Sequence, residues 1–397
     1  MNAAEELVFE LCRQSFLRLW SYANPRGKKG KELCDALVVF DPDVVIFSVK
    51  EIALRDGGNP GIDRERWIRA AVHESHAQIW GAERWIGTAA RVVRADGGEG
   101  LPFPPRDARR IHRVAVALGS GGVIGVESRD YGHGFVHVLD DVSLSLIMRE
   151  MDTVRDFVGY LRAKEELYAS AREVRVPAGE EDLLAVYLHR GRSFRDLPER
   201  ISIQQGAWDE LHRKPEFRRR KLADRASYAW DSLIDFLAGE VEGDGLEFGT
   251  LGEMESLLRV MAGEDRFARR MLGRAFRAFL DAAAAEEVQS RTTVSPSGVR
   301  YVFLAHPHGG DREWRLMELQ GRCFVARSLE PKCETVIGIA TDRPRRGAGF
   351  SMDALRLTIE EWTEEHQRQA EDGQRQFGWF ANPSMRTEPE DEYPGSS

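Results

Sequence analysis

Apolar residues recur at helical spacing at the start of the chain, which predicts an amphipathic helix from about Ala3 to Trp20. Two apolar runs follow, Leu33 to Phe40 and Val44 to Lys50. Only Asp41-Pro42-Asp43 separates them. Because so short a connection makes two strands fold back on each other, the pair is predicted to be a β-hairpin.

A second helical pattern follows the hairpin over residues 64–86, with Asp63 in a good position to cap it. Gly119–Gly122 could suggest a phosphate loop, but these glycines lie between two predicted strands and open no helix, so a hairpin turn is predicted. The order helix, hairpin, helix, strands, helix predicts an α/β sandwich around a small mixed sheet. The remaining predicted elements of this region are strands at His112–Leu118, Val123–Glu127 and Gly134–Leu139 and a helix at Leu144–Ala169.

The rest of the chain divides by composition. The stretch Pro177–Glu181 has the composition of a linker, and 183–290 is mainly helical in pattern, with a loop near 190–204. The polar segment after Pro383 is predicted to be disordered. Strands are predicted at Val299–Ala305, Trp314–Ala326 and Thr335–Ala340, and a helix at Met352–Gln369. The predicted domains are 1–172, 180–290 (helical) and 291–382 (α/β), with a tail at 383–397.

Composition and charge narrow the function classes. The net charge of −9 argues against a protein that coats nucleic acid, although it allows a local basic groove. Candidates for such a groove are Arg106, Arg109, Arg110 and Arg113, and the run Arg218–Lys221. No run of 18 apolar residues occurs and the first residues are acidic, so a cytoplasmic protein without a membrane partner is predicted.

The four cysteines, Cys12, Cys34, Cys323 and Cys333, are scattered without metal-binding spacing. They are predicted to be reduced and buried, and to form neither a zinc site nor a disulfide.

The hairpin carries the candidate chemistry. Side chains alternate between the faces of a strand, and either a two-residue or a four-residue loop places Asp35, Ser48 and Lys50 on the same face. The shorter loop sets Asp35 opposite Ser48, and the longer one sets it opposite Lys50. A carboxylate and an ammonium group at the end of an apolar face are costly unless they serve each other or a ligand.

Metal-assisted phosphodiester hydrolysis uses such a pair. A carboxylate holds Mg²⁺, and a neighbouring lysine positions water and offsets the negative charge that develops on the phosphate. Gln78, on the following helix beside a stripe of small residues that includes Ala71 and Ser75, is expected to pack against the sheet.

Asp35, followed across a hairpin by Ser48-Val49-Lys50 and then by a helix with Gln78, resembles the PD-(D/E)XK nucleases. Their motif is an Asp, then Glu/Asp-x-Lys on the next strand, then often a helical Gln. The short spacing resembles the Mrr-type, NERD and Holliday-junction-resolvase branches. The Ser-x-Lys form is similar to a subset of restriction enzymes whose second acid lies on the following helix, although there the first acid lies much further upstream.

This resemblance covers about residues 1–90, and up to about 165. It implies a restriction-endonuclease-like αβββα core, Mg²⁺ or Mn²⁺ as cofactor and DNA as partner, and it suggests a role in restriction or phage defence. It leaves self-association into a homo-oligomer open.

Ser48 departs from the motif, because a hydroxyl group is no substitute for a carboxylate as a metal ligand. The second acid must therefore come from elsewhere. Glu74, one helical turn before Gln78, is the first candidate, so the predicted metal ligands are Asp35 and Glu74. Strict alternation puts Glu32 on the opposite face from Asp35 unless the strand begins irregularly. Glu10 and Glu65 are further candidates.

Three functions follow from this pattern. The leading hypothesis is a Mg²⁺-dependent endonuclease that uses Asp35, a second acid, Lys50 and Ser48. The alternative is an inactive nuclease-fold protein that binds nucleic acid or protein, with Asp35 and Lys50 as a buried salt bridge. A Ser-Lys hydrolase built on Ser48 and Lys50 is the third, although no glycine-rich elbow lies beside them. His73 and His76 lack a third metal ligand and are predicted to be surface residues.

Overall fold

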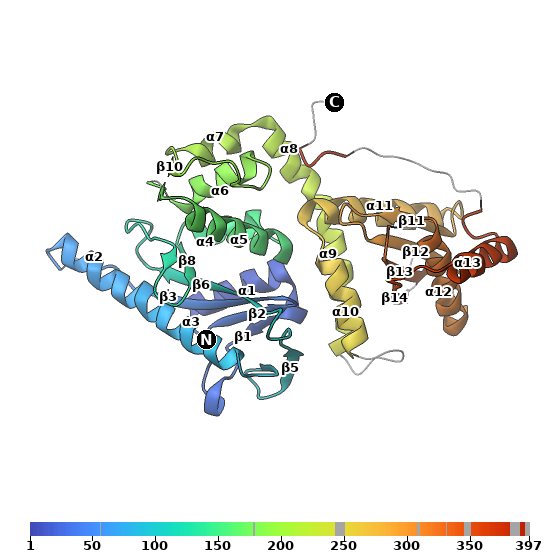
Figure 1. Cartoon of the computed structure of the whole chain (residues 1–397), viewed down its shortest axis with the longest axis horizontal. Helices are drawn as coiled ribbons and strands as arrows, with labels where there is room; N and C mark the ends of the chain where they lie inside the picture. The colour runs from blue at the N-terminus through green and yellow to red at the C-terminus, as the bar shows by residue number, and fades with distance from the viewer. Residues whose placement is uncertain are drawn as a thin grey trace. The chain divides into compact units, whose positions relative to one another are not determined.

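The computed structural model describes residues 1–55, 57–177, 179–242, 251–307, 310–330, 332–344, 351–381 and 390–393. The chain forms two compact units, Met1–Arg218 and Arg219–Ser397, and each is described by itself. Both units are mixed α/β structures (Figure 1), which agrees with the predicted α/β class.

The first unit is built around one large sheet and helices that cover it. Its helices are α1 (Ala3–Phe16), α2 (Pro60–Ile68), α3 (Glu74–Ile86), α4 (Ser143–Glu150), α5 (Val154–Ser170), α6 (Glu180–His189) and α7 (Ala207–Arg213), and α8 (Pro215–Ala223) crosses into the second unit. Its strands are β1 (Ser21–Ala23), β2 (Ala36–Phe40), β3 (Asp43–Glu51), β4 (Arg91–Val93), β5 (Glu99–Pro102), β6 (Arg110–Leu118), β7 (Arg129–Asp130), β8 (Phe135–Asp140), β9 (Glu173–Arg175) and β10 (Arg200–Ser202).

The main sheet has the strand order β1-β2-β3-β6-β8-β7. β2 is antiparallel to β1 and β3, whereas β3, β6 and β8 are parallel to one another. Helix α3 covers one face of the sheet and α5 covers the other (Figure 1). The alternation of apolar residues explains the two layers: Leu37 and Ile46 pack with Ile79 of α3, while Phe47 stacks on Phe157 of α5.

Local backbone chemistry shifts several predicted boundaries. α1 ends at Phe16, four residues before the predicted end at Trp20, because Leu17 adopts a left-handed φ of 68°. The second helix begins at Pro60, before the predicted Asp63, because the side chain of Asn59 caps it by accepting from the amide of Gly61 at 3.2 Å. A π-helical turn at Arg69–His73 joins α2 to α3.

Three predictions in the middle of this unit are wrong. β6 and β8 are parallel, so Gly119–Gly122 is not a hairpin turn, and Val123–Glu127 forms no strand. Instead Asp141 accepts hydrogen bonds from the amides of Gly119, at 2.9 Å, and Gly121, at 3.0 Å. The predicted helix Leu144–Ala169 is two helices, α4 and α5, because Thr153 leaves helical geometry to cap α5.

The first compact unit continues past residue 172, the predicted end of the first domain, to Arg218. Nζ of Lys164 in α5, which is fully buried, lies 2.5 Å from the carboxylate of Glu180 at the start of α6. Tyr160 donates to the same carboxylate at 2.6 Å, and Lys164 also donates to Ser128 at 2.7 Å. A buried ion pair needs several partners to offset its desolvation, and here they tie α6 to the first unit. The linker-like stretch Pro177–Glu181 therefore lies within a domain, of which Ala178 is outside the described residues.

The second unit has a four-stranded sheet in the order β11-β12-β13-β14. β12 and β13 are parallel and the outer strands are antiparallel to them. The strands are β11 (Ser290–Val294), β12 (Arg300–His306), β13 (Thr335–Asp342) and β14 (Met352–Thr358), and the helices are α9 (Tyr228–Glu242), α10 (Leu251–Ala262), α11 (Arg266–Ala284), α12 (Arg312–Ser328) and α13 (Glu364–Phe377).

Both faces of this second sheet are covered. Val302 and Leu304 pack with Leu319 of α12, whereas Tyr301 and Phe303 contact Trp230 of α9 on the other face. The predicted strand Trp314–Ala326 is wrong: this segment is α12, the crossover helix that two parallel strands require. The predicted helix Met352–Gln369 is in fact the edge strand β14 followed by α13.

The structure also bears on the cysteines, on membrane-spanning helices, on the tail and on the unit boundaries. All four cysteines are free and buried, as predicted. No helix in the described part of the chain is both long and apolar enough to cross a membrane. Within the predicted disordered tail, Glu390–Tyr393 is held by arginines of the second unit, and the other tail residues lie outside the described ranges. The compact units meet between Arg218 and Arg219, whereas the predicted domains are bounded at 172, 180 and 290.

Candidate functional site

The hairpin of β2 and β3 has the shorter of the two loops considered for it. The pairing runs from Ala36 opposite Phe47 to Phe40 opposite Asp43, so Asp41 and Pro42 form a two-residue loop. The amide of Asp35 donates to the carbonyl oxygen of Phe47 at 3.2 Å. The same register continued by one pair therefore sets Asp35 opposite Ser48, on the face that α3 covers.

Gln78 of α3 links Ser48 and Lys50. Its Oε1 atom accepts from Oγ of Ser48 at 2.8 Å and from Nζ of Lys50 at 3.1 Å. Both partners are donors at this point, which places the carbonyl oxygen of the amide between them. Gln78 lies against the sheet, as predicted, and Ser75 and Ala71 beside it are fully buried.

Ser48 is fully buried, whereas Lys50 is partly exposed. Ser48 and Lys50 both donate to Gln78, and no hydrogen bond joins them to each other among the described residues. A buried hydroxyl with an amide partner cannot attack a substrate, so this geometry gives no support to a Ser-Lys hydrolase.

Asp35 lies at the point where β2 begins, and its side chain is 2% exposed. Its Oδ2 atom accepts the backbone N–H of Val49 at 2.5 Å. β2 has no residue left to pair with Val49 at this end, so the carboxylate takes the place of a backbone acceptor. The predicted buried salt bridge is absent: within the described residues no ion pair joins Asp35 to Lys50.

Glu32 is the second acid of the site. Nδ2 of Asn24 donates to its Oε2 atom at 3.0 Å. Glu32 is exposed at the surface, but partial desolvation of its carboxyl group raises its pKa most, and the nearby carboxylate of Asp35 raises that pKa further. The expectation that Glu32 faces away is wrong, because β2 begins only at Ala36 and strict alternation does not apply before it.

The other acids lie outside this arrangement. Glu74, the first candidate, is exposed, because the face of α3 that packs on the sheet carries Ser75, Ile79 and Ala82. Glu65 is also exposed. Glu10 forms an ion pair with Arg13 on the same helix, at 3.4 Å. Glu32, and not the predicted Glu74, is therefore the acid that lies beside Asp35.

Asp35 and Glu32 could supply only two protein ligands to a magnesium ion. Within the described ranges no group of three or more His, Cys, Asp and Glu side chains is arranged to hold a metal. Mg²⁺, however, is commonly bound by one or two carboxylates, with water and substrate phosphates as its other ligands. Asp35 and Glu32, which lie beside each other, meet that requirement.

His73 is exposed, as predicted, and His76 is half-buried; both belong to a cluster of aromatic rings. His76 of α3 stacks with His133 at a ring distance of 5.7 Å, and His133 stacks on Trp80 at 4.2 Å. His73 contacts the edge of Tyr131. Burial lowers the pKa of His76, which favours the neutral ring in this stack.

Two arginines of the predicted basic groove at 106–113 make contacts within the first unit instead of lining a groove. Arg113 forms an ion pair with Glu83 of α3 at 2.6 Å, and Arg109 donates to backbone carbonyl groups of Ile86 and Pro104. The exposed basic residues near the acid pair are instead Lys28, Lys29 and Lys31, which immediately precede Glu32. These lysines are not among the predicted basic residues, and the sequence signal that could have indicated them is their place in the same short segment as Glu32.

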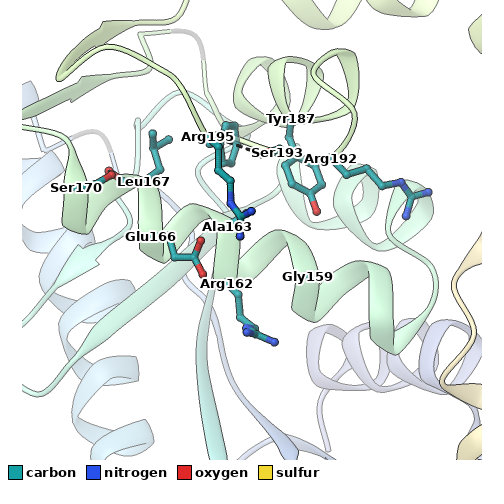
Figure 2. A pocket seen from close by; sticks show the side chains of 11 residues that line it. Gly159, Arg162, Ala163, Glu166, Leu167, Ser170, Tyr187, Arg192, Ser193 and Arg195 are labelled. Carbon is teal, nitrogen blue, oxygen red and sulfur yellow. Dashed lines mark hydrogen bonds between the residues drawn. The ribbon is translucent and has the colours of Figure 1, made fainter. Parts of the chain in front are cut away.

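A separate cleft of about 540 Å³ lies on the outer side of α5 (Figure 2). Arg195 reaches toward Arg162 and Glu166 in this cleft, and Phe194 and Leu167 form apolar parts of its wall. α5 covers the opposite face of the sheet from Ser48 and Gln78. The cleft therefore takes no part in the candidate site.

No known protein family model and no curated protein matches this chain. The interpretation of the site therefore depends on its residues and their geometry.

Proposed function

We propose that the first unit is a metal-dependent endonuclease that hydrolyses phosphodiester bonds in DNA. The observation that carries the proposal is the gathering of Asp35, Glu32, Ser48, Lys50 and Gln78 at one end of the β2–β3 hairpin. Two neighbouring acids and a lysine held by an amide are the groups that metal-assisted phosphodiester hydrolysis uses.

The order of elements supports the proposal. α1 is followed by β1, β2 and β3 and then by α2 and α3, which is the helix, three strands and helix order of the αβββα core that the resemblance implies. The candidate acids lie just before β2, Lys50 lies on β3, and Gln78 lies on the helix after them. Fold alone does not define activity, so the argument depends on the side chains.

Each residue has a distinct role in this proposal. Asp35 and Glu32 would hold Mg²⁺ or Mn²⁺, which supplies Lewis-acid activation of the phosphate and of water. Lys50 offsets negative charge on the attacked phosphate, and Gln78 holds the ammonium group in position. Ser48 orients Gln78 from the buried side. Lys28, Lys29 and Lys31, exposed beside the acids, would contact the phosphates of the DNA backbone.

A cleavage assay with matched variants tests the proposal. Plasmid, linear and single-stranded DNA would be incubated with Mg²⁺, Mn²⁺ or EDTA. Asp35→Asn, Glu32→Gln and Lys50→Met should each lower cleavage at least about a hundredfold, which is the scale for loss of an electrostatic catalytic group. Glu74→Gln, a change of an exposed acid on the same unit, should leave cleavage unchanged. Cleavage that persists in EDTA or in Lys50→Met would refute the assignment.

One observation favours a second candidate function. The position that normally carries an acid holds Ser48, which is buried and hydrogen-bonded to Gln78. A nuclease-fold module that binds DNA without cleaving it would tolerate this substitution. In the same assay, DNA binding without cleavage by wild-type protein under any metal condition would support this alternative.

A further inference from the structure

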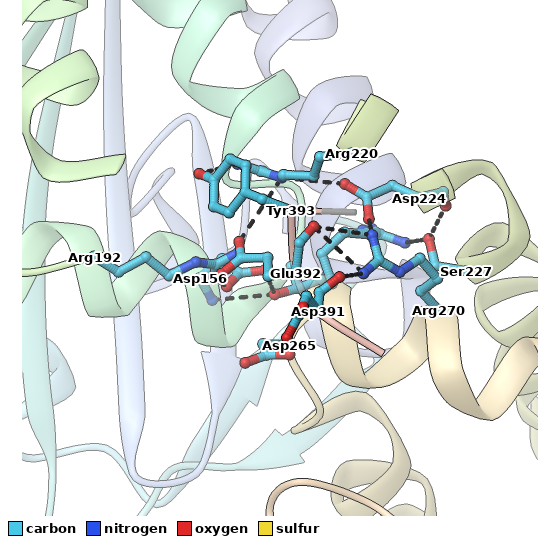
Figure 3. Close-up of polar contacts among 12 residues, drawn as sticks. Asp156, Arg192, Arg220, Asp224, Ser227, Asp265, Arg270, Asp391, Glu392 and Tyr393 are labelled. Carbon is cyan, nitrogen blue, oxygen red and sulfur yellow. Dashed lines mark hydrogen bonds and ion pairs between the residues drawn. The ribbon is translucent and has the colours of Figure 1, made fainter. Parts of the chain in front are cut away.

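The second unit holds the acidic segment Glu390–Tyr393 against three arginines. Figure 3 shows two of them, Arg220 and Arg270, beside Asp391, Glu392 and Tyr393. Arg220 lies on α8, and Arg270 and Arg274 lie on α11. The side chains of Arg220 and Arg270 are 1% and 0% exposed, whereas that of Arg274 is 47% exposed. Guanidinium groups keep their charge when buried, so they need anionic or carbonyl partners at this depth.

One carboxylate oxygen of this segment joins two of the arginines. Oε1 of Glu390 lies 2.8 Å from Nε of Arg270 and 2.5 Å from Nη1 of Arg274. Arg270 also donates through Nη2 to the carbonyl oxygen of Asp391 at 2.7 Å. Residues 270 and 274 are one helical turn apart, so their side chains project from the same side of α11. Two guanidinium groups that converge on one anionic oxygen form an arrangement suited to phosphate.

Arg220 contacts an aromatic ring. Its Cζ atom lies 5.4 Å from the ring centroid of Tyr393, and its Nη1 atom donates to the Tyr393 hydroxyl at 3.1 Å. Oε1 of Glu392 lies 3.8 Å from its Nε atom. A guanidinium group that packs on a tyrosine ring in this way can pack on an unpaired nucleobase.

The charges on both sides of this contact are complementary. Arg220 and Arg270 share Asp224 of their own helical region, at 3.4 Å and 3.0 Å. The C-terminal segment adds the carboxylates of Glu390 and Glu392. Its departure would remove two carboxylates from beside three guanidinium groups and leave excess positive charge.

We propose that Arg220, Arg270 and Arg274 form a binding site for single-stranded DNA, which Glu390–Tyr393 occupies in the unbound protein. The carboxylate of Glu390 takes the place of a phosphate, and the ring of Tyr393 takes the place of a base. A duplex keeps its bases paired and stacked, so a single strand fits both parts of the site. The choice of DNA rests on the proposed function, whereas the preference for an anion and a ring comes from the second unit alone.

The test measures DNA binding in EDTA, so that cleavage plays no part. Fluorescence anisotropy with labelled oligo(dT) would compare the full chain with a chain truncated before Glu390. The truncated chain should bind about tenfold more tightly at low salt, because an internal anion no longer competes. Its salt dependence should steepen by roughly 1.4 if two phosphates replace the two carboxylates, at about 0.7 for each phosphate of a single strand.

Three controls define the site. Removal of only Pro394–Ser397, which contains no acid, should leave affinity unchanged. The double change Glu371→Gln and Asp372→Asn, at exposed acids of α13, should have little effect, whereas Glu390→Gln with Glu392→Gln should reproduce the gain without a truncation. Arg274→Ala, at a half-exposed position, should cancel the gain in the truncated chain.

The results separate this inference from the proposed nuclease. Equal affinity of the full and truncated chains for oligo(dT) would overturn the inference even if the protein cleaves DNA. Tighter binding of duplex than of single strand by the truncated chain would overturn the assignment to single strands. Tighter oligo(dT) binding by a protein that never cleaves DNA would support this site and count against the nuclease.

Discussion

Replacement of Gln78 by leucine tests whether one amide organises the candidate site. The change keeps a side chain of similar size against the sheet but removes the oxygen that accepts from Ser48, at 2.8 Å, and from Lys50, at 3.1 Å. Ser48 is fully buried, so water cannot replace the lost acceptor. Lys50 is partly exposed, so its ammonium group can turn toward solvent.

The size of the effect follows from this difference in burial. An unsatisfied buried hydroxyl costs about 1–3 kcal/mol, and this dominates the expected loss of stability in Gln78→Leu. Ser48→Ala alone should cost about 0.5–1.5 kcal/mol, because Gln78 keeps Lys50 as a partner. The double variant should lose less than the sum of the two single variants by about 1 kcal/mol, since it leaves no buried hydroxyl without a partner.

Urea denaturation followed by circular dichroism gives the four free energies of this cycle. Gln14→Leu, at an exposed position of α1, is the matched control and should change stability by less than about 0.5 kcal/mol. Losses that simply add in the double variant would show that Ser48 and Gln78 are not coupled, and the geometry proposed for the site would then be refuted.

Three further predictions test other parts of the chain. Lys164→Met should destabilise the first unit by about 3–5 kcal/mol in urea denaturation, because it leaves the carboxylate of Glu180 buried without its cation. The double variant Lys164→Met with Glu180→Leu should recover most of that loss. A loss under about 1 kcal/mol for the single variant would contradict the link between α5 and α6. Burial lowers the pKa of His137 from 6.5 to about 4, so the neutral ring stabilises the fold fully above about pH 6.5, and the unfolding free energy falls by roughly 1.4 kcal/mol for each pH unit between 6.5 and 4. His137→Gln should flatten this part of the profile of unfolding free energy against pH. An unchanged slope would count against the neutral, buried state of His137. Ser48→Glu places a carboxylate in a fully buried position and should lower the midpoint of thermal unfolding in EDTA. Mg²⁺ should restore part of that loss if the acid pair holds the ion. A midpoint that is the same with and without Mg²⁺ would argue against a metal site.

The hairpin shows how much local pattern determined. Alternating apolar residues and the short connection left few possible registers, and the two that were weighed, with a loop of two or four residues, put Asp35, Ser48 and Lys50 on one face. The helical position of Gln78 against the sheet followed in the same way from periodicity. Burial of the four cysteines followed from their chemistry and scatter.

Long-range packing decided what local pattern left open. Glu32 became the partner of Asp35 because β2 begins late, and no rule of alternation applies before a strand begins. The segment Trp314–Ala326, predicted to be a strand, is a helix because β12 and β13 are parallel neighbours that need a crossover.

Long-range packing also decided where the first unit ends and how the segment Glu390–Tyr393 is held. Lys164 meets Glu180, and Arg270 meets Glu390, only because the chain folds back over long sequence distances. Sequence by itself determined the α/β class, the hairpin and the shared face of its polar residues, since these follow from the period of side chains along a strand or helix. Tertiary structure alone decided which acid completes the site, where the first unit ends and what covers the arginines of the second, because each depends on contacts between residues far apart in the chain.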